Sequence, residues 1–217
     1  MADQTLVLIG DSILDNAPYT DYGKDTTSLL TQMLAPEWSV SRCARDGHTM
    51  DCIDGQLRSF KGHAAVAVLS IGGNDVTHHI GMLERSAISY REVLGTLLQV
   101  ADDFELAYRS VAQAVSSRAD RTILCTIYEV QLEPPEFARL ARVPLALFND
   151  RIVRTGARLG LDVLELRDVC TEPSDFVCQI EPSTQGARKI AQAIASLLKS
   201  ESSLRYSRIF GGVQPGD

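Results

Sequence analysis

The chain has 217 residues, of which 45% are hydrophobic and 23% are charged, and its formal net charge is -7 at pH 7. A chain of this length can bury the core of one α/β domain. The acidic balance and the lack of any basic run argue against a nucleic-acid-binding surface, and no apolar stretch is long enough to cross a bilayer.

Apolar or alternating segments predict five strands. In chain order they are Thr5–Ile9, Trp38–Ser41, Ala64–Ile71, Thr122–Ile127 and Leu161–Leu166. The first, third and fourth segments are nearly continuous apolar runs, which are typical of parallel strands buried on both faces of a sheet. The second is short and alternates.

Helical periodicity occupies the intervals between these segments. We expect helices at Asp25–Leu34, Ala87–Ala101, Phe104–Val115, Pro144–Gly160 and about Ser183–Lys199. Pro144 is predicted to open its helix, because the first helical turn does not need the proline N–H, and Gly160 is predicted to end it.

Strands that alternate with helices at this spacing predict a parallel sheet covered by helices on both faces. Because parallel crossovers are right-handed, we expect a three-layer α/β/α sandwich with five strands in a flavodoxin-like order. Residues 1–203 are expected to form this single domain. The tail at 204–217 is rich in Gly, Pro and Ser, and we expect it to be loosely ordered.

The step Gly10-Asp11-Ser12 follows the first strand directly, at the sheet edge where open α/β proteins bind ligands. Ser12 is therefore a candidate nucleophile, which needs a base for its proton and donors for an oxyanion. Gly47, after the second strand, can present its N–H closely to a substrate. Asn74, in the Gly72–Asp75 run after the third strand, offers a side-chain amide.

Each of these motifs has an ordinary structural reading when it is taken alone. Gly47 can serve a tight turn only, and Asn74 can cap one. Their joint occurrence, after three successive strands, favours an active site.

On these three motifs, and over nearly its whole length, the chain resembles the SGNH, or GDSL-type, hydrolases. The resemblance implies that Ser12 is the catalytic serine. It implies an oxyanion hole made by the N–H of Ser12, the N–H of Gly47 and the side chain of Asn74. It also implies hydrolysis or transfer of acyl groups from lipids, carbohydrates, thioesters or small esters, with no cofactor. The wider stretch Gly10–Asn16 is similar to a bacterial branch of the family.

The last block departs from the family pattern, which places an aspartate and, three residues later, a His-Pro pair before the C-terminal helix. Glu181 stands at the position of the histidine, and Cys178 stands at the position of the aspartate. Asp175 is nearby, but its spacing does not match. The usual base and its orienting acid are both replaced.

Glu181 has two opposed readings. An apolar crevice would raise its pKa from ~4.3 by about 2 units, which suits a general base for Ser12, and a carboxylate needs no third residue to fix a tautomer. As a carboxylate at the N-terminus of the last helix, it would interact favourably with the helix dipole, which lowers the pKa and opposes base catalysis. The two readings predict opposite shifts of one measurable pKa.

Several other side chains are candidate accessories of the site. His48 or His79 is a candidate alternative base, although a solvated surface histidine is the more ordinary reading. The adjacent pair His78 and His79 has no third ligand at metal spacing, so no metal site is predicted. Cys178 is either a reactive thiol at the mouth of the site or an apolar filler. Asp11 has no assigned role beyond positioning the turn.

Cysteine usage and the start of the chain bear on the compartment. The cysteines are odd in number and form no C-x-x-C pair; they are Cys43, Cys52, Cys125, Cys170 and Cys178. We therefore expect reduced thiols in a cytoplasmic protein. The first strand begins close to Met1, which leaves no room for a signal peptide.

The sequence thus predicts a cytoplasmic serine hydrolase that acts on a small-molecule ester or acyl compound, with Ser12 as nucleophile and Glu181 as a modified base. The polar loop after the fourth strand, around Pro134 and Pro135, is expected to border the crevice. The alternative is a catalytically inactive binding or sensor protein on the same scaffold, which the missing histidine motivates. No nucleic-acid partner and no membrane span are predicted, and the oligomeric state stays open.

Overall fold

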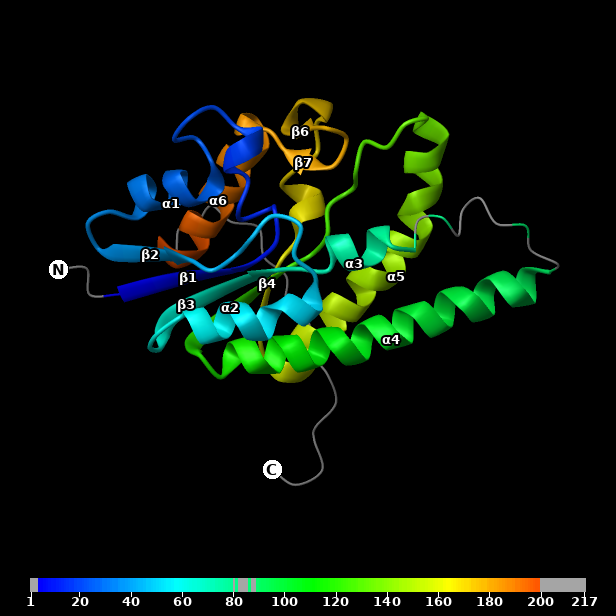
Figure 1. Ribbon diagram of the computed structural model, residues 1–217, viewed down its shortest axis with the longest axis horizontal. Helices are drawn as coiled ribbons and strands as arrows, with labels where there is room; N and C mark the ends of the chain where they lie inside the picture. The colour runs from blue at the N-terminus through cyan, green and yellow to red at the C-terminus, as the bar shows by residue number, and fades with distance from the viewer. Residues whose placement is uncertain (1–3, 80, 82–85, 87–88, 200–217) are drawn as a thin grey trace, which may run out of the picture.

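A parallel sheet forms the middle layer of the computed structural model, which describes residues 4–79, 81, 86 and 89–199 (Figure 1). Its five strands follow the order β2-β1-β3-β4-β5. They are β1 (Gln4–Gly10), β2 (Trp38–Arg42), β3 (Ala64–Ser70), β4 (Ala119–Cys125) and β5 (Asp162–Leu164). Every neighbouring pair is parallel. The expected α/β/α sandwich with a flavodoxin-like strand order is confirmed.

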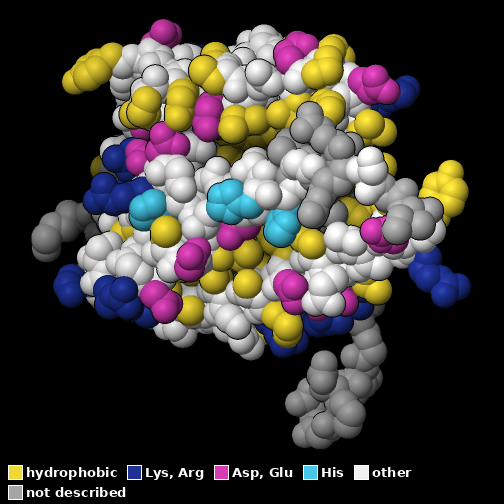
Figure 2. Space-filling model, turned by 45° about the vertical axis from the view of Figure 1, so that its right-hand side comes forward, with side chains coloured by type: hydrophobic (Ala, Val, Ile, Leu, Met, Phe, Trp, Pro, Cys, Tyr) yellow, Lys and Arg dark blue, Asp and Glu magenta, His cyan; other side chains and the backbone are white. Residues whose placement is uncertain are grey.

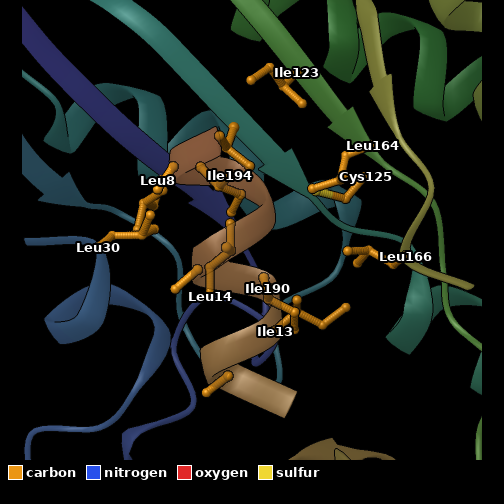
Figure 3. Packing of buried hydrophobic residues seen from close by; sticks show 14 of the residues in the cluster. Leu8, Ile13, Leu14, Leu30, Ile123, Cys125, Leu164, Leu166, Ile190 and Ile194 are labelled. Carbon is orange, nitrogen blue, oxygen red and sulfur yellow. The ribbon is translucent and has the colours of Figure 1, made fainter. Parts of the chain in front are cut away.

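Helices cover both faces of this sheet (Figure 1). One face carries α1 (Thr26–Leu34) and α6 (Thr184–Lys199), and the other carries α2 (Ile53–Ser59), α4 (Tyr90–Ser116) and α5 (Pro135–Leu159). Successive residues of a strand point to opposite faces, so β1 sends Leu8 into one core and Ile9 into the other. Figure 3 shows Ile194 of α6 beside Leu8, and Ile190 of the same helix beside Ile13, in the first of these cores.

Shorter elements lie in the segments that follow the carboxyl ends of the strands. The helix α3 (Gly73–Thr77) follows β3 almost directly, and β6 (Phe176–Val177) pairs with β7 (Glu181–Pro182) in a separate antiparallel hairpin. Short 3-10 helices span Ala17–Tyr19, Met50–Cys52, Leu166–Asp168 and Pro173–Asp175. Neither α2 nor the hairpin was expected from the sequence, because segments this short show no periodicity.

Two helix predictions are wrong. A single helix, α4, replaces the two helices expected at 87–101 and 104–115, since nothing between them breaks the helical pattern; residues 87–88 lie outside the described part. Helix α5 begins at Pro135, and Pro144 lies inside it. Pro135 occupies the first turn, where the missing N–H costs nothing. The interior Pro144 accords with the change of direction along α5 in Figure 1.

Two strand boundaries also differ from the prediction. β4 begins at Ala119 and ends at Cys125, and β5 is limited to Asp162–Leu164. Within the described ranges, no helix combines the length and the apolar character needed to cross a membrane. The tail at 204–217 lies outside the described residues.

Candidate active site

Ser12 lies on the turn that follows β1. The strand ends at Gly10, which has a φ of 144°, and a Cβ at this position would come within 1.8 Å of the carbonyl oxygen of Ser70 on β3. Only glycine fits there, so the chain can pass close to β3 as it leaves the sheet. The N–H of Asp11 then donates to the same Ser70 oxygen at 3.0 Å, which holds the serine turn against β3.

The carboxylate of Glu181 lies next to this serine. The Ser12 hydroxyl is near enough to lower the pKa of this carboxylate, and both residues are buried, with 7% and 8% of their surface exposed. The carboxylate oxygen Oε2 is buried without a hydrogen-bond partner among the described residues. Burial raises the pKa of Glu181, the nearby Ser12 hydroxyl lowers it, and the negative charge of Asp46 raises it. The net shift is upward, in the direction that favours a general base.

Glu181 does not cap the last helix. The Ser183 hydroxyl does so, because it accepts from the N–H groups of Gln185 and Gly186 at 3.1 and 3.2 Å. The lowered pKa that the helix-terminus reading predicts is therefore not found, and the pKa of Glu181 is raised instead.

The hairpin that carries Glu181 is anchored to the loop after β4. The hydroxyl of Tyr128 donates to the carbonyl oxygen of Ile180 at 2.7 Å, and the N–H of Gln131 donates to the carbonyl oxygen of Gln179 at 2.8 Å. These bonds join residues far apart in the sequence and hold the turn of the hairpin against the loop after β4. They anchor the backbone from which the Glu181 side chain extends.

Asp175 serves a different purpose. It is fully buried and forms an ion pair with Lys189 at 2.6 Å, while the amide of Gln185 and the N–H of Glu172 donate to its carboxylate at 3.0 Å each. Burial acts to raise the pKa of Asp175, but the bonds from Lys189, Glu172 and Gln185 outweigh it and lower the pKa. Because Lys189 and Gln185 both belong to α6, these bonds tie Asp175 to that helix rather than to Glu181.

The two further oxyanion-hole candidates lie at the neighbouring strand ends. Gly47 is exposed in the turn after β2, where its φ is 75°. Asn74 lies in α3, and its Nδ2 donates to the carbonyl oxygen of His48 at 2.8 Å. The N–H of Arg45 donates to the carbonyl oxygen of Gly10 at 3.1 Å. These bonds bring the segments that carry Ser12, Gly47 and Asn74 together at the carboxyl edge of the sheet.

Asp11 is almost completely enclosed, with 2% of its surface exposed. Burial raises its pKa to about 8, and the negative charges of Glu181 and Asp75 add to this shift. The N–H of Ile13 donates to its Oδ1 at 3.2 Å and partly offsets the shift. Asp11 therefore carries its proton at neutral pH.

The remaining accessory candidates surround this centre. The ring Nδ1 of His48 lies 2.9 Å from the amide nitrogen of Gln56. His79 is exposed and lines an apolar pocket, and Cys178 is exposed at the tip of the hairpin, where its φ is 50°. Figure 2 shows histidine side chains in a row across this face, with recessed hydrophobic side chains on both sides of the row. Among the described residues, no group of three or more His, Cys, Asp or Glu is arranged to hold a metal ion.

Sequence reasoning missed a tyrosine and an aspartate near the serine. Tyr19 donates a hydrogen bond to Asp46 at 2.8 Å, and this bond is the main cause that raises the pKa of Tyr19 to about 12. The charges of Glu181 and Cys178 also raise the pKa of Tyr19, so these groups share one neighbourhood. Neither residue belongs to a recognisable motif.

Sequence reasoning also missed an apolar pocket with a volume of about 90 Å³. It lies between α3, α4, α5 and the loop after β4, and its wall includes Val76, Leu97, Ile127, Leu132 and Pro144. The pocket reaches Gly73, where a Cβ would lie 3.9 Å from the Oδ2 of Asp11, the neighbour of Ser12. The apolar residues Val130 and Leu132, in a loop expected to be polar, were the available signal.

Comparisons with known proteins assign this chain to a family. The sequence model of the GDSL-like Lipase/Acylhydrolase family matches residues 8–189. A search of curated proteins finds no match.

Several solved structures share the fold at low identity. Phospholipase A1 from Streptomyces albidoflavus NA297 is 14% identical over 93% of this chain and 100% of its own, with a TM-score of 0.67. An extracellular lipase from Streptomyces rimosus is 13% identical over 91% and 99%, with a TM-score of 0.65. LAE5, an alpha/beta hydrolase enzyme from the metagenome of Lake Arreo, Spain, is 18% identical over 90% and 94%, with a TM-score of 0.66. These likenesses show the fold, and the family match covers most of the sequence: the chain belongs to the GDSL-like lipase/acylhydrolase family.

Proposed function

We propose that the protein hydrolyses carboxylic esters, with Ser12 as the nucleophile and Glu181 as the general base. The observation that carries this proposal is the position of the buried Ser12 hydroxyl near the buried Glu181 carboxylate, close enough to lower the pKa of that carboxylate. The raised pKa of Glu181 supports the role of base, because it brings the carboxyl group closer to the pH at which it must accept a proton. The same proximity of the Ser12 hydroxyl to the Glu181 carboxylate favours an enzyme over a binding or sensor protein.

The reaction proceeds in two halves. Ser12 Oγ attacks the carbonyl carbon of the ester, and its proton passes to Glu181. The intermediate collapses, the alcohol leaves with this proton, and the acyl group stays on Ser12. Glu181 then takes a proton from water, the resulting hydroxide attacks the acyl carbon, and the proton returns to Ser12 as the acid is released.

The oxyanion of each tetrahedral intermediate accepts hydrogen bonds from the N–H groups of Ser12 and Gly47 and from the Nδ2 of Asn74. Asn74 Nδ2 has two hydrogens, and the carbonyl oxygen of His48 uses one of them. The second hydrogen is available for the oxyanion. Removing one such donor costs about 3 kcal/mol of transition-state stabilisation in comparable sites.

A carboxylate base suits this centre for an electrostatic reason. Glu181 becomes neutral as it takes the serine proton, at the moment when negative charge develops on the substrate oxygen. The charge therefore moves within the site and does not accumulate. Asp11 also limits the negative charge in the site, because its raised pKa of about 8 keeps it neutral beside Glu181 at pH 7.

The apolar pocket favours an aliphatic acyl group as the part of the substrate that is bound. Its wall is almost entirely apolar, and it reaches Gly73, close to the serine turn. His79 lies in the wall, whereas Asp46, whose charge acts on Glu181, does not line this pocket, and we assign the departing alcohol to the side of Asp46. We place the reaction in the cytoplasm, which is supported by the five free thiols.

Ester turnover by the wild-type protein and by Ser12→Ala tests the proposal. The assay uses p-nitrophenyl acetate and p-nitrophenyl octanoate, with labelling by a fluorophosphonate probe as a second readout. We expect the wild type to hydrolyse both esters and to be labelled, and Ser12→Ala to do neither. Equal turnover by the two proteins, or a wild type that neither reacts nor is labelled, contradicts the proposal.

A further inference from the structure

Gln56 lies outside the active site and yet contacts two of the segments that form it. It belongs to α2 and is buried, with 4% of its surface exposed. Its side chain forms two hydrogen bonds with the backbone of Gly10, the last residue before Asp11 and Ser12. It also lies 2.9 Å from the ring Nδ1 of His48, the residue after Gly47.

The backbone of Gly10 fixes the orientation of this amide. The Gly10 N–H donates to Oε1 of Gln56 at 2.9 Å, and Nε2 of Gln56 donates to the Gly10 carbonyl oxygen at 2.7 Å. An N–H can only donate and a carbonyl can only accept, so the two ends of the amide cannot be exchanged. The second hydrogen on Nε2 is then directed to His48.

This orientation sets the tautomer of His48. Because Nε2 of Gln56 donates, Nδ1 of His48 must accept, and the ring hydrogen of the neutral imidazole lies on Nε2. A ring in this form cannot take the Ser12 proton at Nε2. The assignment therefore argues for Glu181, not His48, as the base.

The backbone of His48 continues the connection. Its carbonyl oxygen accepts the hydrogen bond from Asn74 Nδ2 at 2.8 Å. One chain of hydrogen bonds thus runs from Gly10 through Gln56 and His48 to Asn74, and it links the ends of β1, β2 and β3. These are the segments that carry the nucleophile and the oxyanion donors.

We infer that Gln56 is a positioning residue for catalysis: it sets the spacing between the serine turn and the oxyanion-hole segments and holds His48 in the tautomer with hydrogen on Nε2. Gln56 touches no substrate and acts through Gly10 and His48. Its kinetic consequence rests on the proposed function, whereas the state of the His48 ring does not.

Two substitutions separate the effect of Gln56 on the spacing of the segments from its effect on the tautomer of His48. Gln56→Leu removes all the hydrogen bonds of the side chain, and Gln56→Glu keeps the shape but replaces the donor by an acceptor. In Gln56→Glu we expect the hydrogen to move to Nδ1 of His48, where it can be donated to the new carboxylate. Long-range ¹H–¹⁵N correlation spectra of the histidine rings report this change directly.

The kinetic expectation is a loss of turnover without a loss of substrate binding. We expect kcat for p-nitrophenyl octanoate to fall about 10-fold to 100-fold in both variants, because displaced oxyanion donors stabilise the transition state less well. KM stays within about twofold, since Gln56 is not part of the apolar pocket.

Asn149 provides a matched control for stability. Its side-chain amide is fully buried and forms the same pair of bonds with one backbone residue. The Ile127 N–H donates to Asn149 Oδ1 at 2.8 Å, and Asn149 Nδ2 donates to the Ile127 carbonyl oxygen at 2.7 Å, without a hydrogen bond to His48. Asn149→Asp should lower the melting temperature as Gln56→Glu does, and it should leave hydrogen on Nε2 of His48.

The outcomes are distinct. Hydrogen that stays on Nε2 of His48 in Gln56→Glu, a kcat within twofold of wild type in both Gln56 variants, or the same tautomer change in Asn149→Asp overturns the inference. A wild type without ester turnover counts against the proposed function alone, and the spectra still decide the role of Gln56 toward His48.

Discussion

The Ser12 hydroxyl lies near the carboxylate of Glu181, close enough to lower its pKa, and both residues are more than nine-tenths buried. The two residues come from opposite ends of the chain, one from the turn after the first strand and the other from a short hairpin before the last helix. A buried acid that lies near a serine, with a raised pKa, can occupy the place of a histidine base. The following predictions test the surroundings of this pair.

Asp11→Asn should make the stability of the protein less dependent on pH. The ordinary pKa of an aspartate side chain is 3.8, and the pKa of Asp11 in the folded protein is about 8. Between these values the folded state keeps a proton that the unfolded state has lost, so wild-type stability falls as pH rises, by at most about 1.4 kcal/mol per pH unit. This contribution is complete below pH 3.8 and is lost once pH has passed through about 8.

Urea unfolding at pH 5, 7 and 9 measures the effect. Relative to the wild type, Asp11→Asn should gain stability steadily with pH, because its amide does not ionise and its oxygen still accepts from Ile13. If the two proteins show the same pH dependence of unfolding, Asp11 is not a protonated acid in the folded state.

Gly10→Ala should destabilise the protein severely. The added Cβ would meet the Ser70 carbonyl oxygen at 1.8 Å, and backbone on both sides prevents relief. We expect the free energy of unfolding to fall by more than about 3 kcal/mol. Gly23→Ala is the control, because Gly23 also has a positive φ, of 70°, but a Cβ there meets nothing within 4 Å. Its cost should be about 1 kcal/mol; equal costs for the two substitutions would refute the crowding at Gly10.

Ala141→Trp should narrow the range of acyl chains that the proposed active site accepts. Ala141 lines the apolar pocket, whereas Ala146 on the same helix is exposed and does not. Excluding two methylene groups from the pocket costs about 1.6 kcal/mol, so kcat/KM for p-nitrophenyl octanoate should fall more than about tenfold. The acetate ester and the Ala146→Trp control should react as before. A parallel loss with both esters would show that the pocket does not hold the acyl chain.

Much of the fold follows from local patterns in the sequence. Apolar runs located β1 and β3 to within one residue at each end, because strands buried on both faces leave no polar interruption. The helix at Pro144 was misplaced because proline is compatible with both a first turn and a tolerated interior site, and the sequence alone does not choose between them. The short hairpin β6–β7 has no periodicity that could have revealed it.

The site was predictable only in part, for a related reason. Ser12, Gly47 and Asn74 each follow a strand, and parallel strands end at one edge of the sheet, so chain order alone brings them together. The pKa of Glu181 depends on how deeply the hairpin buries it, which is a tertiary property. Gln56 gave no signal, because its importance comes from contacts with Gly10 and His48 that lie far from it in the sequence.

The rate of Ser12 acylation in Glu181→Gln tests the central claim most directly. The amide keeps the shape and the polarity of Glu181 but cannot accept the serine proton. In a rapid-mixing experiment with p-nitrophenyl octanoate at pH 7, the account predicts that the burst of p-nitrophenol slows by about 10²-fold to 10⁴-fold relative to wild type. A burst within twofold of the wild-type rate, from a protein with an unchanged melting temperature, would contradict Glu181 as the base.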